Sequence, residues 1–356
     1  MKKVSVIVII LFVMMIGIPG KWGDSPIIAE GNHEEAVLQV PAASSPGYSL
    51  PGKTILRCLY YDQQAFKESY SQANKLSESQ VNALSETLLQ PSGAATLQGG
   101  ILPHHLVASP MIARFFAALK TEESEINLSD PETIILLAPN HKRIGDRPLH
   151  TGAFSWETPF GQLEADVDMV NGLIRSLEVG VNPILLEEEH AIAALIPYIR
   201  HTFPKAKIVP ILIHGNTGRE DCKALSEFLI QKALDKPCLI LASIDFSHGL
   251  KPEEALKRDE TTRRVMAARD YDTLFGLDNT YLDAPPTLAT FLMTMDGLKE
   301  KEDRDAEKDS DQGDLKYAEG TLLDHSEASR FLKRRVPDTT SYMTWLFTAK
   351  PSLERP

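Results

Sequence analysis

The chain has 356 residues, of which 43% are hydrophobic and 24% are charged, the usual balance of a folded globular protein. Its formal net charge of −12 argues against a nucleic-acid-binding protein, because such proteins present a basic face to the phosphates. Three cysteines, Cys58, Cys222 and Cys238, form no C-x-x-C pair, which excludes a zinc ribbon and a redox dithiol. We expect them to be small buried side chains, although one disulfide remains possible outside the cytoplasm.

The N-terminal segment has the pattern of an export signal. Lys2 and Lys3 precede an apolar run at residues 4–18, which Pro19 and Gly20 end. The run is short for a membrane span, which needs roughly 17–20 residues, yet no clear cleavage site follows it. We therefore expect residues 1–23 to be a signal peptide or an uncleaved N-terminal anchor. The rest of the chain would then lie outside the cytoplasm, with membrane attachment only through this segment.

After this segment, the sequence predicts a proline-rich flexible linker at residues 24–52 and one α/β domain at residues 53–350. The alternation of strands and helices predicts a mostly parallel central sheet with helices on both faces. In chain order the expected elements are strand 55–61, helix 64–89, strand 99–102, helix 110–119, strand 133–138, helix 165–177, strand 183–186, helix 190–202, strand 206–213, helix 221–234, strand 238–244, helices 252–270 and 287–295, and strand 342–347.

Two details of this pattern bear on the fold. Pro197 should kink or end the helix expected at residues 190–202, because proline lacks the amide hydrogen that a helix interior needs. The stretch at residues 299–314 is almost entirely charged, so we expect an acidic flexible insertion near residues 299–316.

Polar residues follow three of the expected strands. His104 comes after strand 99–102, His141 after strand 133–138, and Asp245 with His248 after strand 238–244. Ligands of open α/β sheets bind beyond the carboxyl ends of the strands, so these side chains are expected to share one pocket. Imidazoles together with a carboxylate suit a divalent transition metal. Asp245 could instead orient His248 from the second layer, or cap the next turn.

Two further histidines need a choice. His104 and His105 are adjacent and would face opposite ways on an extended segment, so we assign only His104 to the pocket. His190 follows three glutamates, whose charges would favour a helix N-terminus, and we expect His190 to be a base or a substrate ligand at the pocket mouth. The other histidines are expected to be structural or exposed: His33, His150, His201, His214 and His325. The sequence contains neither a G-x-S-x-G elbow nor a glycine-rich phosphate loop.

Ordered blocks of sequence resemble the Memo family, which includes protein B of the AmmeMemoRadiSam system. They include LYYDQQAFKES, GGILPHHLVAS, IILLAPNHKRIGD, EEEHAIAALIPYI and LILASIDFSHGL. The resemblance implies a fold like that of class III extradiol dioxygenases, with a pocket that binds iron or copper. It also implies pocket positions for five residues of this chain: His104, His141, His190, Asp245 and His248.

The chain departs from the family pattern at two places. The family has a cysteine in a C-G motif where this chain reads LDAPP, so Asp283 stands in the place of that cysteine. This would exchange a soft metal ligand for a hard one and change the metal preference. In addition, residues 193–195 read Ala-Ala-Leu where the family has a polar pair.

These observations lead to a functional prediction with alternatives. We expect His104, His141 and either Asp245 or Asp283 to hold Fe(II) or copper, with zinc less expected, while His190 and His248 act as acid, base or substrate ligands. The reaction would be redox or dioxygenase chemistry on a small aromatic or phenolic substrate. One alternative is a non-enzymatic module that binds a small molecule, a peptide or the metal itself, and another is a metal-dependent hydrolase.

Overall fold

The computed structural model describes residues 55–73, 96–119, 130–306, 318–332 and 336–349, all of which belong to one compact unit, Gly47–Pro356. The expected export segment and linker, residues 1–52, lie outside the described residues. Within the described ranges, no helix has both the length and the apolar character that crossing a membrane requires.

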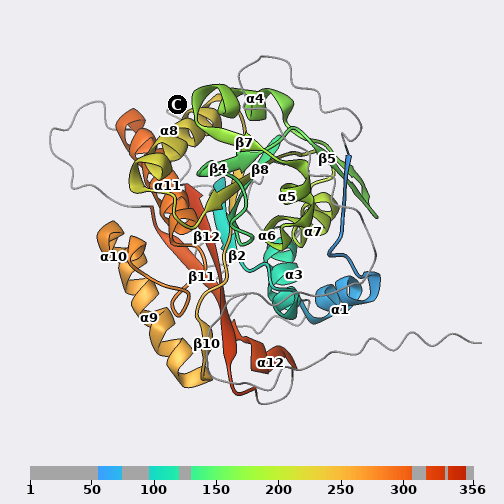
Figure 1. The fold of residues 1–356 in the computed structure, drawn as a ribbon, viewed down its shortest axis with the longest axis vertical. Coiled ribbons are helices and arrows are strands. Elements are labelled where there is room, and N and C mark those ends of the chain that lie inside the picture. The colour runs from blue at the N-terminus through green and yellow to red at the C-terminus, as the bar shows by residue number, and fades with distance from the viewer. Residues whose placement is uncertain (1–54, 74–95, 120–129, 307–317, 333–335, 350–356) are drawn as a thin grey trace, which may run out of the picture. The chain divides into compact units, whose positions relative to one another are not determined.

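Four parallel strands form the centre of a nine-stranded sheet, in the order β2-β9-β3-β8. All eight residues of β3 are buried, which is typical of a strand covered on both faces. This confirms the mixed α/β fold with a central sheet between helices (Figure 1). The four strands are β2 (Thr96–Leu102), β3 (Thr133–Asn140), β8 (Lys207–His214) and β9 (Cys238–Ser243).

The flanks of the sheet are partly antiparallel, so the expectation of a mostly parallel sheet is right only for its centre. β12 (Thr339–Ala349) runs antiparallel beside β2 and also pairs with β10 (His248–Leu250) and β11 (Gly320–Glu327). At the other edge, β4 (Leu149–Thr151) is antiparallel to β8 and parallel to β7 (Val179–Val181). A separate three-stranded sheet contains β1 (Ile55–Arg57), β5 (Ser155–Thr158) and β6 (Gly161–Leu163).

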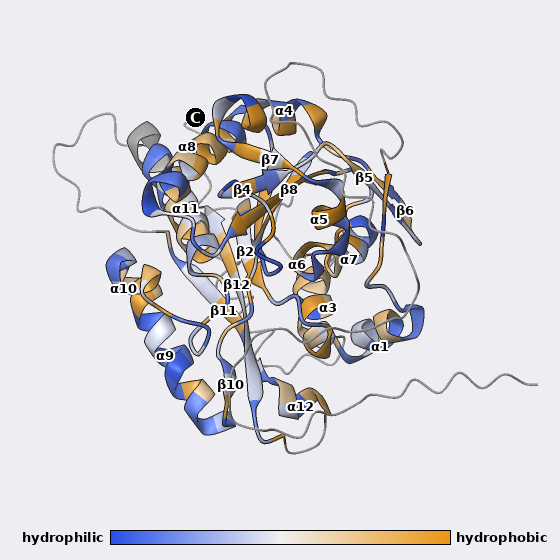
Figure 2. Cartoon of the chain, viewed as in Figure 1, coloured by the Kyte–Doolittle hydropathy of each residue, from blue (hydrophilic) through white to orange (hydrophobic). Residues whose placement is uncertain are grey.

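Helices cover both faces of the central sheet and create two apolar layers. One layer contains buried side chains of α4 (Val167–Ser176), α8 (Arg219–Asp235) and α11 (Pro285–Ala306). The opposite layer contains side chains of α1 (Gln63–Ala73), α3 (Ser109–Ala118) and α7 (Ile196–Thr202). Figure 2 shows the charged helix α9 (Pro252–Ala268) as largely hydrophilic. The other helical elements of the described residues are η1 (Leu106–Ala108), α5 (Pro183–Glu188), α6 (His190–Ala193), α10 (Tyr271–Phe275) and α12 (Ala328–Leu332).

The strand expected at residues 183–186 is wrong, because this segment is helix α5 (Pro183–Glu188). Asn182 caps the helix by accepting a hydrogen bond from the amide of Leu185 at 3.0 Å. Pro183 occupies the first turn, where a helix tolerates the missing amide hydrogen. The capping residue followed by proline therefore predicts the helical structure of this segment better than the short apolar run predicts a strand.

Two other expectations need correction. Residues 190–202 form two helices, α6 (His190–Ala193) and α7, and Pro197 lies in the first turn of α7, where it begins a second helix instead of kinking or ending a single one. The acidic insertion expected near residues 299–316 is helical up to Ala306, as part of α11, because lysine and glutamate favour helices. The rest of that insertion falls on residues 307–316, outside the described part of the chain.

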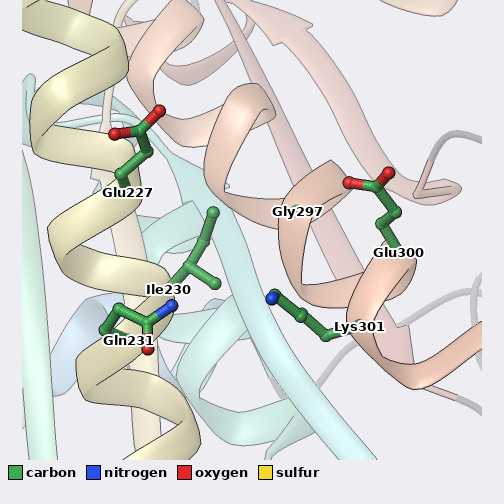
Figure 3. A pocket seen from close by; sticks show the side chains of 6 residues that line it. All are labelled: Glu227, Ile230, Gln231, Gly297, Glu300 and Lys301. Carbon is green, nitrogen blue, oxygen red and sulfur yellow. The ribbon is translucent and has the colours of Figure 1, made fainter. Parts of the chain in front are cut away.

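A cavity of about 440 Å³ lies between α8 and α11 (Figure 3). Ile230 lies beside Gly297, where an added Cβ would come within 2.2 Å of the Ile230 side chain, so glycine permits the close packing of the two helices. The lining residues are Glu227, Ile230 and Gln231 of α8, and Gly297, Glu300 and Lys301 of α11. None of these six residues follows a central strand, so this cavity is separate from the predicted pocket.

Candidate metal centre

Three histidines come together beyond the carboxyl ends of the central strands. One potential ligand atom each from His104, His141 and His190 lies within 4.8 Å of the others. His104 follows the end of β2, and His141 directly follows β3. Because β9 lies between these two strands, their ends are close together at one edge of the sheet. His190 arrives from a different direction, as the first residue of α6.

His104 is held in one protonation form by its neighbours. The side chain is buried, and its Nδ1 lies 3.0 Å from Oγ of Ser243. Ser243 donates its only hydroxyl hydrogen to the carbonyl of Ala191 at 2.7 Å, so it must accept a hydrogen bond from Nδ1 of His104. Burial lowers the pKa of His104 well below its ordinary value, and the neighbouring His141 adds to this effect. The neutral ring therefore carries its lone pair on Nε2.

His141 and His190 share one carboxylate, that of the fully buried Glu189. Nδ1 of His141 lies 2.9 Å from Oε1 of Glu189, and Nδ1 of His190 lies 3.1 Å from the same oxygen. The two imidazole rings are stacked, with 4.4 Å between their centroids. Both rings are oriented through Nδ1, which leaves Nε2 of each as the available ligand atom.

Asp283 supplies a carboxylate beside the imidazoles. Its Oδ2 lies 3.3 Å from Nε2 of His104 and 3.2 Å from Nε2 of His141. Its Oδ1 is buried, and no hydrogen-bond partner for it is found among the described residues. An oxygen without a partner and a nitrogen lone pair that faces a carboxylate both favour a cation between them. This donor set therefore fits a metal ion.

Asp245 lies slightly farther from the imidazoles than Asp283. Its Oδ2 is 3.6 Å from Nε2 of His104, while its Oδ1 accepts a hydrogen bond from the amide of His104 at 3.2 Å. Burial raises the pKa of Asp245 well above its ordinary value, and the adjacent Asp283 raises it further. Of the two candidate carboxylates, Asp283 is the better placed ligand.

His141 carries a positive charge in the absence of a metal. Burial alone would lower the pKa of His141, but hydrogen bonds to Asp283 and Glu189 outweigh burial and raise the pKa to about 10. Burial alone would likewise raise the pKa of Glu189, yet His141 and His190 lower it to about 2. A metal ligated by Nε2 of His141 would have to displace one proton, so binding would release it.

His248 lies outside the cluster of three histidines. It begins β10, and its amide donates to the carbonyl of Asn279 at 3.1 Å. Its buried Nδ1 finds no hydrogen-bond partner within the described ranges, and burial lowers its pKa, although Asp283 opposes this shift. His105 directly precedes η1 and is not one of the three clustered histidines; its Nδ1 lies 2.8 Å from the hydroxyl of Tyr342.

Glu189 is a residue of the candidate site that the sequence interpretation missed. The acidic run was assigned to a helix N-terminus, but Glu187 and Glu188 lie at the end of α5 and only Glu189 caps α6. Glu187 binds Arg57 and Glu188 binds Lys142, so the three glutamates have different partners. A glutamate next to a predicted histidine ligand was the available signal, because metal-binding histidines often donate their other nitrogen to a carboxylate.

No thiol belongs to the cluster. The three cysteines are free, with Cys222 buried and the other two partly buried, so no disulfide forms among them. Sγ of Cys58 faces the carbonyl of Ala193 at 4.0 Å, and Sγ of Cys222 faces that of Pro286 at 3.6 Å. The candidate donors are therefore nitrogen and oxygen atoms only.

Comparisons with known proteins agree with the resemblance to the Memo family. Residues 67–302 match the family described as Memo-like protein. A MEMO1 family protein of Sulfurisphaera tokodaii is 30% identical over 192 residues, which cover 50% of this chain and 62% of that protein. A MEMO1 family protein of Saccharolobus solfataricus is 30% identical over 212 residues, 54% of this chain and 69% of that protein. The chain therefore matches somewhat less than two thirds of the first of these relatives.

One solved structure matches this chain in part. A crystal structure of an uncharacterized protein from Escherichia coli K12 covers 70% of this chain and 99% of that chain, with a TM-score of 0.43 and 11% sequence identity.

Proposed function

Because the chain belongs to the Memo-like family, we propose that its three-histidine cluster binds one divalent transition metal ion. The proposal rests on one structural feature that His104, His141 and His190 have in common. Nδ1 of each ring already has a protein partner, so each Nε2 can serve as a ligand. This arrangement is typical of metal sites, where the second nitrogen of each histidine is held by the protein.

Asp283 completes the proposed ligand set. Its Oδ2 is close to two of the three Nε2 atoms, so one ion can be shared by the carboxylate and the imidazoles. Imidazole and carboxylate donors favour Fe(II) and similar divalent ions, whereas Cu(I) prefers the soft sulfur ligands that are not found in this cluster. We therefore favour Fe(II) over Cu(I) for this chain.

The exposed side of the cluster suggests where a substrate would enter. His190 has the most accessible side chain of the three, at 40%, against 28% for His141 and 2% for His104. The ring of Tyr60 lies 6.2 Å from that of His190 and would contribute an aromatic wall. A bound Fe(II) would supply oxygen-dependent redox chemistry on a small phenolic substrate, as the resemblance implies. His248 remains our choice for the group that moves a proton.

The non-enzymatic alternative loses part of its support. It depended on the loss of a polar pair at Ala193 and Leu195, but both side chains are fully buried in the apolar core. Their apolar character therefore contributes to packing. The non-enzymatic alternative predicts that the metal-loaded protein consumes no oxygen when phenolic compounds are added. The first proposal predicts that it does.

The experiment that tests the proposal is elemental analysis after anaerobic loading with Fe(II) and removal of the excess metal. We expect a stoichiometric ion in the unaltered protein and none in a His104→Ala, His141→Ala double variant. A His214→Ala variant serves as a control, because His214 follows the pattern of a strand-end histidine but binds the amide of Asn216. An unaltered protein that stays free of metal would overturn the proposal, as would a double variant that retains it.

A further inference from the structure

We propose that Glu189 is the positioning residue of this site, a single carboxylate that sets the orientation and the donor atom of two metal-binding histidines. This inference rests on the proposed function, since it concerns how His141 and His190 are presented to the ion. Within the acidic run at residues 187–189, only Glu189 has this role.

The contacts of Glu189 use both carboxylate oxygens. Oε2 accepts a hydrogen bond from the amide of His141 at 3.0 Å, and Oε1 lies 2.9 Å from the Nδ1 of the same residue. Oε1 also lies 3.1 Å from Nδ1 of His190 and accepts from the amide of Ala191 at 3.2 Å. One side chain thus holds the backbone and ring of His141 together with the ring of His190.

The local fold explains why only Glu189 reaches the site. Glu189 separates α5 from α6 and has an extended backbone, with φ −75° and ψ 110°. This break in the helix turns its side chain back over the first turn of α6, towards the end of β3. Glu187 and Glu188 remain in α5 and bind Arg57 and Lys142 instead. Helix capping and support of the site are therefore combined in the same carboxylate.

The negative charge has a chemical consequence for both rings. A carboxylate that accepts from Nδ1–H keeps the hydrogen on that nitrogen and makes Nε2 a stronger donor to a metal. A glutamine at position 189 would preserve the length of the side chain but replace one accepting oxygen with an NH₂ group. Either the backbone amide or the ring of His141 would then face a donor, so one of the two contacts that hold His141 would be lost.

The test compares Glu189→Gln with the matched variant Glu188→Gln, using Co(II) as the probe. We expect Glu189→Gln to weaken Co(II) binding on the order of 10- to 100-fold and to change the visible d–d spectrum of the bound ion. Glu188→Gln should retain both the affinity and the spectrum, because Glu188 pairs with Lys142 near the surface. A Glu189→Gln variant that binds Co(II) like the unaltered protein would overturn the role of Glu189.

A second measurement needs no substitution and applies even if Glu189→Gln does not fold. Long-range ¹H–¹⁵N spectra of the Zn(II)-loaded protein report which nitrogen of each histidine bears the hydrogen. We expect Nδ1–H for His141 and His190, and ligation through Nδ1 of either would contradict the inference. If the unaltered protein bound neither Co(II) nor Zn(II), the proposed function itself would fail, which separates the two outcomes.

Discussion

His104 and Ser243 form a hydrogen bond whose direction is determined by a third residue. Ser243 Oγ lies 3.0 Å from Nδ1 of His104 and donates to the carbonyl of Ala191 at 2.7 Å. Since a hydroxyl has one hydrogen, the imidazole must be the donor in the first bond, and its Nε2 must face Asp283 unprotonated. The last residue of β9 thus sets the donor atom of the histidine that follows β2.

Substitution of Ser243 tests this relationship. Ser243→Ala would leave the buried Nδ1–H of His104 without an acceptor, which costs roughly 1–3 kcal/mol of unfolding free energy. It should also weaken Co(II) binding by about 10- to 100-fold, because the ring could rotate or change its tautomer. Urea unfolding and Co(II) titration measure the two effects. Ser226→Ala, a buried serine of α8, is the control, and equal Co(II) affinity for both variants would contradict the prediction.

The choice between Asp283 and Asp245 as metal ligand can be tested by converting each to cysteine. Asp283→Cys should give the Co(II)-loaded protein a thiolate charge-transfer band in the near ultraviolet and increase its affinity for Cu(I). The shorter side chain is partly offset by the longer metal–sulfur bond, about 2.3 Å against 2.0–2.2 Å for oxygen. Asp245→Cys should give no such band, because Asp245 lies farther from His104. The opposite pattern would assign the ligand to Asp245.

The positions of His104, His141 and Asp245 could be predicted because each follows an apolar run that forms a central parallel strand. Neighbouring parallel strands end at the same edge, so chain order alone brings these residues close together. The same argument did not decide between Asp245 and Asp283. That choice depends on differences of a few tenths of an ångström between side chains, which hydrophobic patterns do not encode.

Other features depend on long-range contacts that the sequence pattern does not contain. The three-residue strands β4 and β7 are too short to show periodicity; β4 pairs with the edge of β8, and β7 pairs in turn with β4. The role of Glu189 follows from a helix break between α5 and α6, where a single continuous turn would have pointed the side chain elsewhere. His190 was assigned to proton transfer or substrate binding, and its place among the ligand atoms comes from the same break.

The turn after His141 requires a glycine at position 145. Gly145 has φ +103°, and an added Cβ would lie 2.0 Å from Nε2 of the buried His150. Gly145→Ala should therefore reduce the unfolding free energy by roughly 1–3 kcal/mol for the backbone alone, with a further loss from displacement of the imidazole. Thermal unfolding measures the change. Gly215→Ala is the control, because no heavy atom lies within 4 Å of its added Cβ, and equal melting temperatures would contradict this explanation.

Asp166 should make stability depend on pH in the acid range. Burial alone would raise the pKa of Asp166, but hydrogen bonds from Lys236, Thr133 and the amide of Met169 outweigh it and lower the pKa below its ordinary value. A carboxyl whose pKa is lower in the folded state stabilises the fold above the unfolded pKa, about 3.9, and loses that contribution as the pH falls through the folded value.

Asp166→Asn should consequently be less stable than the unaltered protein at pH 7, and the difference should narrow at pH 3 and below. Urea unfolding at the two pH values measures it. Glu157→Gln serves as the control, since Glu157 is exposed on β5 and surface substitutions usually change stability by less than about 0.5 kcal/mol. A difference between Asp166→Asn and the unaltered protein that is the same at both pH values would show that the asparagine disturbs packing and that the charge of Asp166 contributes nothing.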